Sequence, residues 1–292
     1  MSTQSTRPSR PARPATVLAL DMGGTHLRHV VATSNQDLAA PLTARLHVSR
    51  EASERDDPVQ QIRRLVQAVD RDRGPLQHVV IGLPGVVHDG RLLDAPNLLP
   101  LQDTSALERL RTALPCPVTF MNDCNLAALG EGGSDLAFIA IGTGLGCGLI
   151  RQGRVMPGAH GQAGELGLLP MPDGSVLEDL LSGPGIRRRH DHYGGSGDVL
   201  TDPGPAGEHT RRDVQAALAS LLQVLTLTVD PASIVFGGGV GQHLGAVIAA
   251  AWSDACTRLS HVPRPTLSRH GDNAALVGGL RLALTPSGAH HG

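Results

Sequence analysis

The chain contains no lysine, so all 25 of its Lys or Arg residues are arginines. This absence excludes several chemistries at once. A Walker-type phosphate-binding loop needs a lysine on the β- and γ-phosphates, a Schiff-base enzyme needs a lysine amine, and a protein kinase needs the lysine of its third strand. Any phosphate site in this protein must therefore be built from other groups.

Aromatic residues and net charge are also scarce. The formal net charge is −2, which gives no strong electrostatic attraction to a nucleic-acid backbone. Proteins that bind single strands stack bases on aromatic side chains, and this chain has few to offer. We expect no nucleic-acid partner. The aromatic residues are Phe120, Phe138, Tyr193, Phe236 and Trp252.

Long apolar runs and paired cysteines are missing too. No stretch approaches the ~18 apolar residues of a membrane-spanning helix, and residues 1–15 lack the apolar core of a signal peptide. We expect that segment to be a disordered tail. The four cysteines are far apart with no C-x-x-C pair, which predicts reduced thiols rather than a disulfide framework or a zinc site. Together these features predict a cytoplasmic protein without a membrane partner.

Glycine is abundant, with 36 residues, and two of its clusters follow similar strands. The apolar run at 16–20 leads into Asp-Met-Gly-Gly-Thr and a second apolar run, which predicts a hairpin. The run at 136–141 leads into a glycine-rich turn and again into an apolar run. We interpret this as an internal duplication of one α/β architecture. It predicts an N-terminal lobe over residues 16–121 and a C-terminal lobe over 122–292, facing a shared cleft, with the last helix free to pack back on the first lobe.

Other segments alternate between strand and helix patterns, as in a largely parallel α/β sheet. The segment 187–212 is polar and glycine-rich, and we expect an irregular surface excursion there with solvated His190 and His192. Further strands are predicted at 78–83, 118–121 and 233–236, and helices at 58–70, 105–114, 122–131, 213–229, 240–255 and 274–284.

The two hairpins are the first candidate sites. Glycines at alternate positions of an extended segment share one face, where bare backbone lets a phosphate approach the N–H donors. Asp21 ends the first strand, where its carboxylate could hold Mg²⁺ directly or through water. The alternatives are a tight hairpin without a ligand and, for Asp21, a turn-capping role. The glycines in question are Gly142, Gly144, Gly146 and Gly148, with Thr25 and Thr143 beside such donors.

A third glycine cluster, 237–239, lies between a predicted strand and a helix. Backbone without side chains there suits a nucleoside base or ribose, although close packing of strand on helix is an equal alternative. The spacing of glycines after residue 142 does not fit the G-x-G-x-x-G dinucleotide fingerprint, because position 147 is a cysteine.

Carboxylates provide the remaining candidates. Asp123 follows a strand at the sheet edge where open α/β sheets bind ligands, and it could accept the proton of an attacking hydroxyl. Its alternative role is to cap the next helix. Glu165 and Glu178 stand among apolar residues, where a carboxylate needs a partner. Sugar hydroxyls would serve, and an internal arginine is the alternative.

Taken together, these motifs resemble the ROK family of bacterial sugar kinases and related repressors. The resemblance extends from Thr16 to about Leu284. Within the family, the motifs DMGGTHLR, APNLLP and GAHGQAGELG are most similar to those of allose kinases. It implies the actin-like, hexokinase-type fold with two α/β lobes around a cleft. The motifs, in order, are LALDMGGTHLR, MNDCNLAALGE, AIGTGLGCGLI, GAHGQAGELG, LEDLLSG and DPASIVFGGGVG.

The resemblance also implies roles for individual residues. Asp123 matches the catalytic base and also touches the sugar. The other implied sugar-binding residues are Gly85, Asn97, Asn122, Glu165 and Glu178. The implied ATP and Mg²⁺ site consists of Asp21, Gly23, Gly24, Thr25, Gly142, Thr143, Gly144 and Gly146, with Gly237, Gly238 and Gly239 along the adenosine. The implied assembly is a homodimer.

One departure from the family is clear. Family members commonly hold a structural zinc with a histidine and three cysteines, whereas this chain has Leu168 at the histidine position and MPDGSVLED in place of the cysteine cluster. We therefore expect no zinc. His160 is nearby in the sequence, but a single histidine without metal-ligating partners is more often a loop residue than a ligand. Because the family histidine also touches sugar hydroxyls, its replacement by Leu168 leaves the identity of the hexose open.

The sequence thus predicts an ATP-dependent hexose kinase that phosphorylates a hydroxyl on glucose, allose or a related hexose, at C6. A DNA-binding repressor is not expected, because the residues before Thr16 are too few for a helix-turn-helix domain. The alternative is a sugar-binding regulatory protein of the same family without phosphotransfer.

Overall fold

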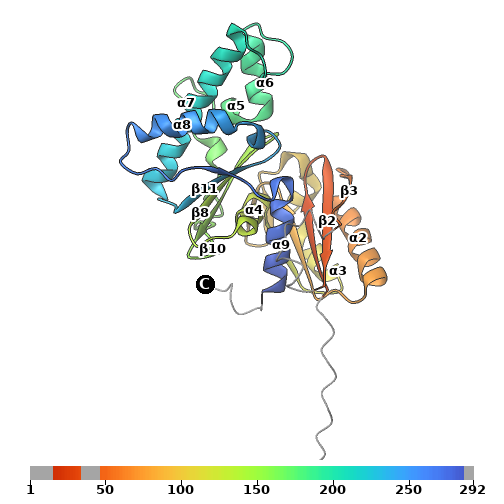
Figure 1. Cartoon of the computed structure of the whole chain (residues 1–292). Coiled ribbons are helices and arrows are strands. Elements are labelled where there is room, and N and C mark those ends of the chain that lie inside the picture. The colour runs from red at the N-terminus through yellow and green to blue at the C-terminus, as the bar shows by residue number, and fades with distance from the viewer. Residues whose placement is uncertain (1–15, 34–46, 286–292) are drawn as a thin grey trace, which may run out of the picture.

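The computed structural model describes residues 16–33 and 47–285 (Figure 1), so the predicted tail at 1–15 lies outside the described residues. Two five-stranded sheets form the framework. The first sheet has the order β3-β2-β1-β4-β7. Its strands are β1 (Val17–Met22), β2 (His26–Ala32), β3 (Ser49–Ala52), β4 (His78–Leu83) and β7 (Val118–Asn122).

The second sheet repeats this plan with the order β10-β9-β8-β11-β12. In both sheets the central strand pairs antiparallel with the strand that follows its glycine-rich turn and parallel with a strand on its other side. The predicted duplication is therefore confirmed. The strands of the second sheet are β8 (Leu136–Ile141), β9 (Leu145–Arg151), β10 (Arg154–Val155), β11 (Ser233–Gly237) and β12 (Thr266–Leu267).

Helices cover both sheets, and a two-stranded ribbon of β5 (Val86–His88) and β6 (Arg91–Leu93) projects from the first. None of the described helices is both long and apolar enough to cross a bilayer. The helices are α2 (Pro58–Arg73), α3 (Ala106–Ala113), α4 (Asp123–Glu131), α5 (Glu178–Leu181), α6 (Gly183–His192), α7 (Pro205–Thr228), α8 (Gly245–Cys256) and α9 (Ala274–Leu284), and the 3₁₀ turns are Pro96–Gln102, Leu166–Leu168, Gly241–His243 and Gly271–Asn273.

The central strand β1 is buried on both faces. Its even-numbered residues from Leu18 to Met22 pack with Ile62 and Val66 of α2. Its odd-numbered residues Val17 and Ala19 pack with the last helix, α9, which lies on the opposite face of the sheet from α2 (Figure 1). Because side chains alternate across a strand, an uninterrupted apolar run is what a strand covered on both faces requires.

Helix α9 also crosses α4 at very close range. A Cβ placed on Gly278 would lie 1.7 Å from the carbonyl oxygen of Leu126, and one on Gly130 would lie 2.1 Å from the carbonyl oxygen of Ala274. The two helices therefore meet backbone to backbone. Because α4 continues from β7 of the first sheet and also packs on β9 of the second, this crossing connects the two halves of the molecule.

The prediction of an irregular excursion at 187–212 is wrong. Helix α6 runs through His192, and α7 already begins at Pro205. Ser182 caps α6 by accepting a hydrogen bond from the Gly185 amide, and a proline stands in the first turn of each helix, where it costs no hydrogen bond. His190 is buried, with 1% of its surface exposed, so the expectation that it is solvated is also wrong.

Candidate active site

A cleft of about 1670 Å³ lies between the two sheets. The first sheet contributes the turn between β1 and β2, and the second contributes the turn between β8 and β9, helix α6 and the segment after β11. The predicted residues that line this cleft are Asp21, Gly23, Gly24, Thr25, Asp123, Gly142, Thr143 and Gly239. The structure therefore brings both predicted hairpins and the predicted base to one space.

The first hairpin turns at Gly23, whose amide donates to the His26 carbonyl at 2.9 Å. Asp21 stands directly before the turn and is only 6% exposed. Its carboxylate forms an ion pair with Arg28, the residue opposite it on β2. The predicted alternative of turn capping does not describe this carboxylate, since its partner is a side chain of the neighbouring strand.

The second hairpin is fixed by the Gly142 amide, which donates to the Gly144 carbonyl at 2.9 Å. No atom would lie within 4 Å of a Cβ on Gly142, so this position is open to the cleft. A Cβ on Gly146 would lie 2.3 Å from the Cys124 sulfur, and one on Gly148 would lie 2.1 Å from the Cys124 carbonyl oxygen. The prediction of one bare face along the whole segment is therefore wrong, because α4 covers it beyond the turn.

The third glycine cluster, residues 237–239, also contains both closely packed and open positions. A Cβ on Gly237 would meet the Phe138 ring at 2.4 Å, and one on Gly238, at φ 81°, would meet the Ile141 carbonyl oxygen at 2.4 Å. Close packing therefore describes these two positions. Gly239 has no neighbour within 4 Å and lines the cleft.

Asp123 is the first residue of α4, and the residue that caps this helix is Asn122, whose side chain accepts from the Asn125 amide at 3.0 Å. The capping role considered for Asp123 is therefore wrong. The Asp123 carboxylate is hydrogen-bonded by the neighbouring Cys124, whose amide donates to it at 2.8 Å and whose thiol also contacts it. Burial, and then the negative charge of Asp21, raise the pKa of Asp123 to about 7. A carboxyl group that titrates near neutral pH is suited to proton transfer.

The predicted sugar-binding residues surround this carboxyl group. The Asn122 amide donates to the Gly85 carbonyl at 3.0 Å, so the side chain joins the two predicted positions. Asn97 lies against the first hairpin, where a Cβ on Gly24 would be 2.6 Å from its own Cβ. These contacts place the loops that carry Gly85 and Asn97 beside Asn122–Asp123 and the first glycine turn.

The two predicted glutamates lie near each other and near the second hairpin. Burial raises the pKa of Glu165, and the nearby charges of Asp94 and Glu178 raise it further. Glu178 accepts the Leu145 amide at 2.8 Å and so links this group to the second hairpin. Among the described residues no arginine is ion-paired with either glutamate, so the internal arginine considered for them is not observed.

The oxygen donors of the cleft fit Mg²⁺. This ion prefers oxygen ligands and is usually held by one or two carboxylates, with water and phosphate oxygens completing its shell. Asp21 and Asp123 are close enough for the charge of one to raise the pKa of the other. No group of three or more metal-ligating side chains occurs within residues 16–33 and 47–285. Leu168, at the family's histidine position, is 62% exposed.

Sequence reasoning missed the arginines of the cleft. Arg28, Arg50, Arg187 and Arg188 all line it. The register of the first hairpin could have revealed Arg28, because Met22 pairs with Leu27 and Asp21 therefore faces Arg28. The cleft-lining segment 197–201 was also missed, because it was assigned to the irregular excursion.

Comparison with known proteins places this geometry in a family. The ROK family model matches residues 17–285. The chain belongs to the ROK family. The resemblance inferred from the motifs is thereby confirmed over almost the whole described chain.

Several ROK relatives are sugar kinases by name. The chain is 35% identical over 233 residues to the bifunctional enzyme NanE/NanK of Brucella suis, a match covering 73% of this chain and 44% of that protein. It thus spans less than half the length of this relative. It is 27% identical over 299 residues to the N-acetyl-D-glucosamine kinase of Photobacterium profundum, covering 89% of this chain and 95% of that protein.

The fold agrees with a solved member of the ROK family. The ROK hexokinase from Thermus thermophilus aligns with a TM-score of 0.74 and 25% identity over 92% of this chain and 97% of that one. The predicted actin-like, hexokinase-type fold is confirmed.

Proposed function

We propose that this ROK protein is an ATP-dependent sugar kinase that transfers the γ-phosphoryl group to a hydroxyl of a hexose. One observation supports this most directly: the Asp123 carboxyl group, whose pKa is raised to about 7, lines the same cleft as both glycine hairpins. A base in this position can reach both the hydroxyl and the phosphoryl group.

In the proposed reaction the sugar hydroxyl attacks the γ-phosphorus of ATP. The new O–P bond forms as the bond to the β-phosphate oxygen breaks, ADP leaves, and Asp123 takes the hydroxyl proton. The turn amides of Gly24, Thr25 and Thr143 would bind the phosphates, because the amides of Gly23 and Gly142 are already bonded within their turns, and Asp21 would be the protein ligand of Mg²⁺. When bound, Mg²⁺ neutralises charge on the phosphate oxygens.

Water must be kept away from this centre, because it would otherwise accept the phosphoryl group in place of the sugar. The cleft is open between the two halves, and we expect them to close on the sugar. Asn97 lies on the loop that contacts the first hairpin, and Glu178 holds the second hairpin. Sugar bound by these side chains would therefore also position both phosphate turns.

The hexose is glucose or allose on the motif resemblance, with C6 as the acceptor position. The name of the Photobacterium relative favours an N-acetylated amino sugar as a second candidate. Leu168 would lie at the position from which the family histidine touches sugar hydroxyls, so the set of hydrogen bonds to the sugar differs from that of zinc-containing members.

A coupled assay of ADP release tests the proposal with glucose, allose, mannose, fructose and N-acetylated hexosamines as acceptors. Asp123→Asn should retain sugar binding, measured by calorimetry, and lose turnover by about 10²–10⁴-fold or more, the usual contribution of a general base. Asp72→Asn, which changes an exposed carboxylate outside the cleft, is the control and should turn over normally. Normal turnover by Asp123→Asn would refute the assignment of the base.

The alternative is a regulatory protein that binds sugar without transferring phosphate. Saturable sugar binding with no ADP release for any acceptor would favour it. Sugar-stimulated ADP release from the wild-type chain would exclude it.

A further inference from the structure

The segment between α6 and α7, residues 193–204, forms part of the cleft wall through residues 197–201. It has no regular secondary structure, and Gly194 and Gly197 adopt positive φ angles. Such a segment needs specific contacts to hold one conformation, because each ordered residue loses backbone entropy. The contacts that hold it are therefore of interest for whatever binds in the cleft.

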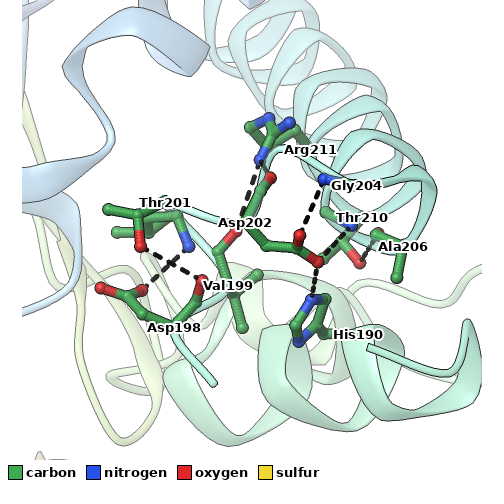
Figure 2. A network of polar contacts seen from close by, with 11 residues as sticks. His190, Asp198, Val199, Thr201, Asp202, Gly204, Ala206, Thr210 and Arg211 are labelled. Carbon is green, nitrogen blue, oxygen red and sulfur yellow. Dashed lines mark hydrogen bonds and ion pairs between the residues drawn. The ribbon is translucent and has the colours of Figure 1, made fainter. Parts of the chain in front are cut away.

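The segment is fixed by a histidine–aspartate pair. His190, on the last turn of α6, is bonded through its Nε2 to Asp202 at 2.7 Å (Figure 2). The ring is enclosed so tightly that a Cβ on Gly195 would lie 2.2 Å from the same nitrogen. The Asp202 carboxylate also accepts the amides of Gly204 at 2.8 Å and Gly207 at 3.1 Å. One carboxylate thus joins α6, the segment and the start of α7.

Further contacts extend from this pair toward the cleft. Arg211 of α7 donates to the Asp202 carbonyl at 2.6 Å, and Figure 2 shows it above the segment. Val199 packs in the core of the second sheet and, like its neighbours Leu200 and Thr201, also lines the cleft. The segment is therefore attached at Val199 and Asp202, and its cleft-facing residues lie between or beside these two points.

The carboxylates at the end of the cleft that the segment 193–204 forms suit a nucleoside better than a phosphate. Helix α6 lines the cleft at Gly183, Arg187 and Asp191, which are spaced one turn apart. Gly183 donates to the Gly142 carbonyl at 2.7 Å, so the hairpin lies at the start of α6 and the segment at its far end. Asp191 and Asp198 stand at that far end. Carboxylates repel phosphate and accept hydrogen bonds from ribose hydroxyls.

We propose that His190 and Asp202 are positioning residues for nucleotide binding, which hold residues 197–201 as the outer wall of the nucleoside end of the cleft. This inference rests on the proposed kinase function. Neither residue touches ATP; they act through the segment. Loss of the pair would loosen the wall and weaken nucleotide binding, with little effect on the sugar pocket around Asp123.

The test uses His190→Phe, which keeps a ring of similar size and removes the nitrogen that bonds to Asp202. We expect the Kd for a non-hydrolysable ATP analogue, measured by calorimetry, to rise about tenfold, a factor that equals ~1.4 kcal/mol. The Kd for the sugar should stay within about twofold. His190→Gln, whose amide nitrogen can again donate to Asp202, should recover most of the nucleotide affinity.

Tyr193→Phe is the matched control. Tyr193, the residue directly after α6, donates to Asp213 of α7 at 2.7 Å and so also ties the start of the segment to α7, but neither residue lines the cleft. This variant should bind the ATP analogue like the wild type. The proposal would be overturned if Tyr193→Phe weakened binding of the ATP analogue as much as His190→Phe does. It would also be overturned if His190→Phe lost sugar and nucleotide affinity equally. Either result would show that the His190–Asp202 pair is a general stabilising contact.

Hydrogen exchange of the wild-type chain gives a second, independent readout. The ATP analogue should slow exchange of the amides at 197–201, and unchanged exchange there on saturation would refute the proposal even if His190→Phe does not fold. Because both measurements use binding without turnover, a wild-type chain that protects this segment but releases no ADP with any sugar would refute the kinase function and leave this inference standing.

Discussion

Asp123→Asn should make the protein more stable while it inactivates it. In the folded chain the pKa of Asp123 is about 7, above its ordinary value of 3.8, because folding removes the carboxylate from water and places it near the charge of Asp21. The ionised form is therefore destabilised by folding. An asparagine has nearly the same shape, still offers an oxygen to the Cys124 amide, and cannot ionise.

The magnitude follows from the rise in the pKa of Asp123 from 3.8 to about 7. Each unit is worth ~1.4 kcal/mol, so the ionised carboxylate costs the folded state roughly 4 kcal/mol at pH 8, and structural relaxation lowers this to about 2–4. The sign is fixed by the direction of the shift. The folded chain keeps the Asp123 proton between about pH 4 and 7 while the unfolded chain releases it, so the cost grows across that interval and is constant above it. At pH 5 only about 1–2 kcal/mol remains.

The assay is urea unfolding followed by circular dichroism at pH 8 and pH 5, with wild type and variant compared at each pH. The free-energy advantage of Asp123→Asn should be about 2 kcal/mol larger at pH 8 than at pH 5. Asp173→Asn is the control. Hydrogen bonds from the side chain and amide of Ser175 lower the pKa of this exposed carboxyl, so its removal should give no stability gain at pH 8.

Two results would refute this reasoning. If Asp123→Asn were less stable than wild type at pH 8, the carboxylate would be favoured by contacts that the geometry does not contain. If its advantage were equal at both pH values, the gain would come from packing, and the ionisation of Asp123 would play no part in it.

Three further outcomes are expected. For the wild type, kcat/KM for the sugar should fall tenfold for each pH unit below about pH 7. Arg28→Gln leaves the charge of Asp21 without its ion pair and should move the midpoint of this pH profile upward. A downward move of the midpoint would contradict the geometry. Arg187→Gln should raise the KM for ATP about five- to tenfold in steady-state assays and leave that for sugar unchanged, because this cation lies one helical turn from the second hairpin. Gly278→Ala should lower the free energy of unfolding by about 2–3 kcal/mol in urea titrations, because its Cβ would overlap a carbonyl oxygen of α4; wild-type stability would show that the helices can separate freely.

Local patterns predicted the framework well. The apolar runs at β1 and β8 are buried on both faces, and the glycines after them turn the chain as hairpins. These features depend on residues close together in the chain, where period and turn chemistry are decisive. The same is true of Asp123 at the end of β7, which a strand-to-helix boundary predicts without knowledge of its neighbours.

The predictions that proved wrong concern features that depend on residues far apart in the chain. The bare face expected along the second hairpin is covered by α4, and nothing in the local sequence indicates that Cys124 packs there. The polar run around His190 predicts a solvated segment, because histidine and arginine side chains are usually exposed to solvent. Here Asp202 satisfies the ring nitrogen and allows it to be buried, and only the folded chain brings these two residues together.

The absence of lysine acquires a structural meaning from the cleft arginines. A lysine ammonium is a mobile point charge, whereas a guanidinium presents a fixed array of donors and is commonly held by a carboxylate. Arg28 is held by Asp21, and Arg188 by Asp179 at 2.8 Å. Within residues 16–33 and 47–285, neither Arg187 nor Arg50 forms an ion pair, so these are the cleft arginines whose charge is free for a phosphate. A site of this kind binds phosphate mainly through backbone amides and two cations, and it should lose affinity with added salt less steeply than a site that relies on several flexible lysines.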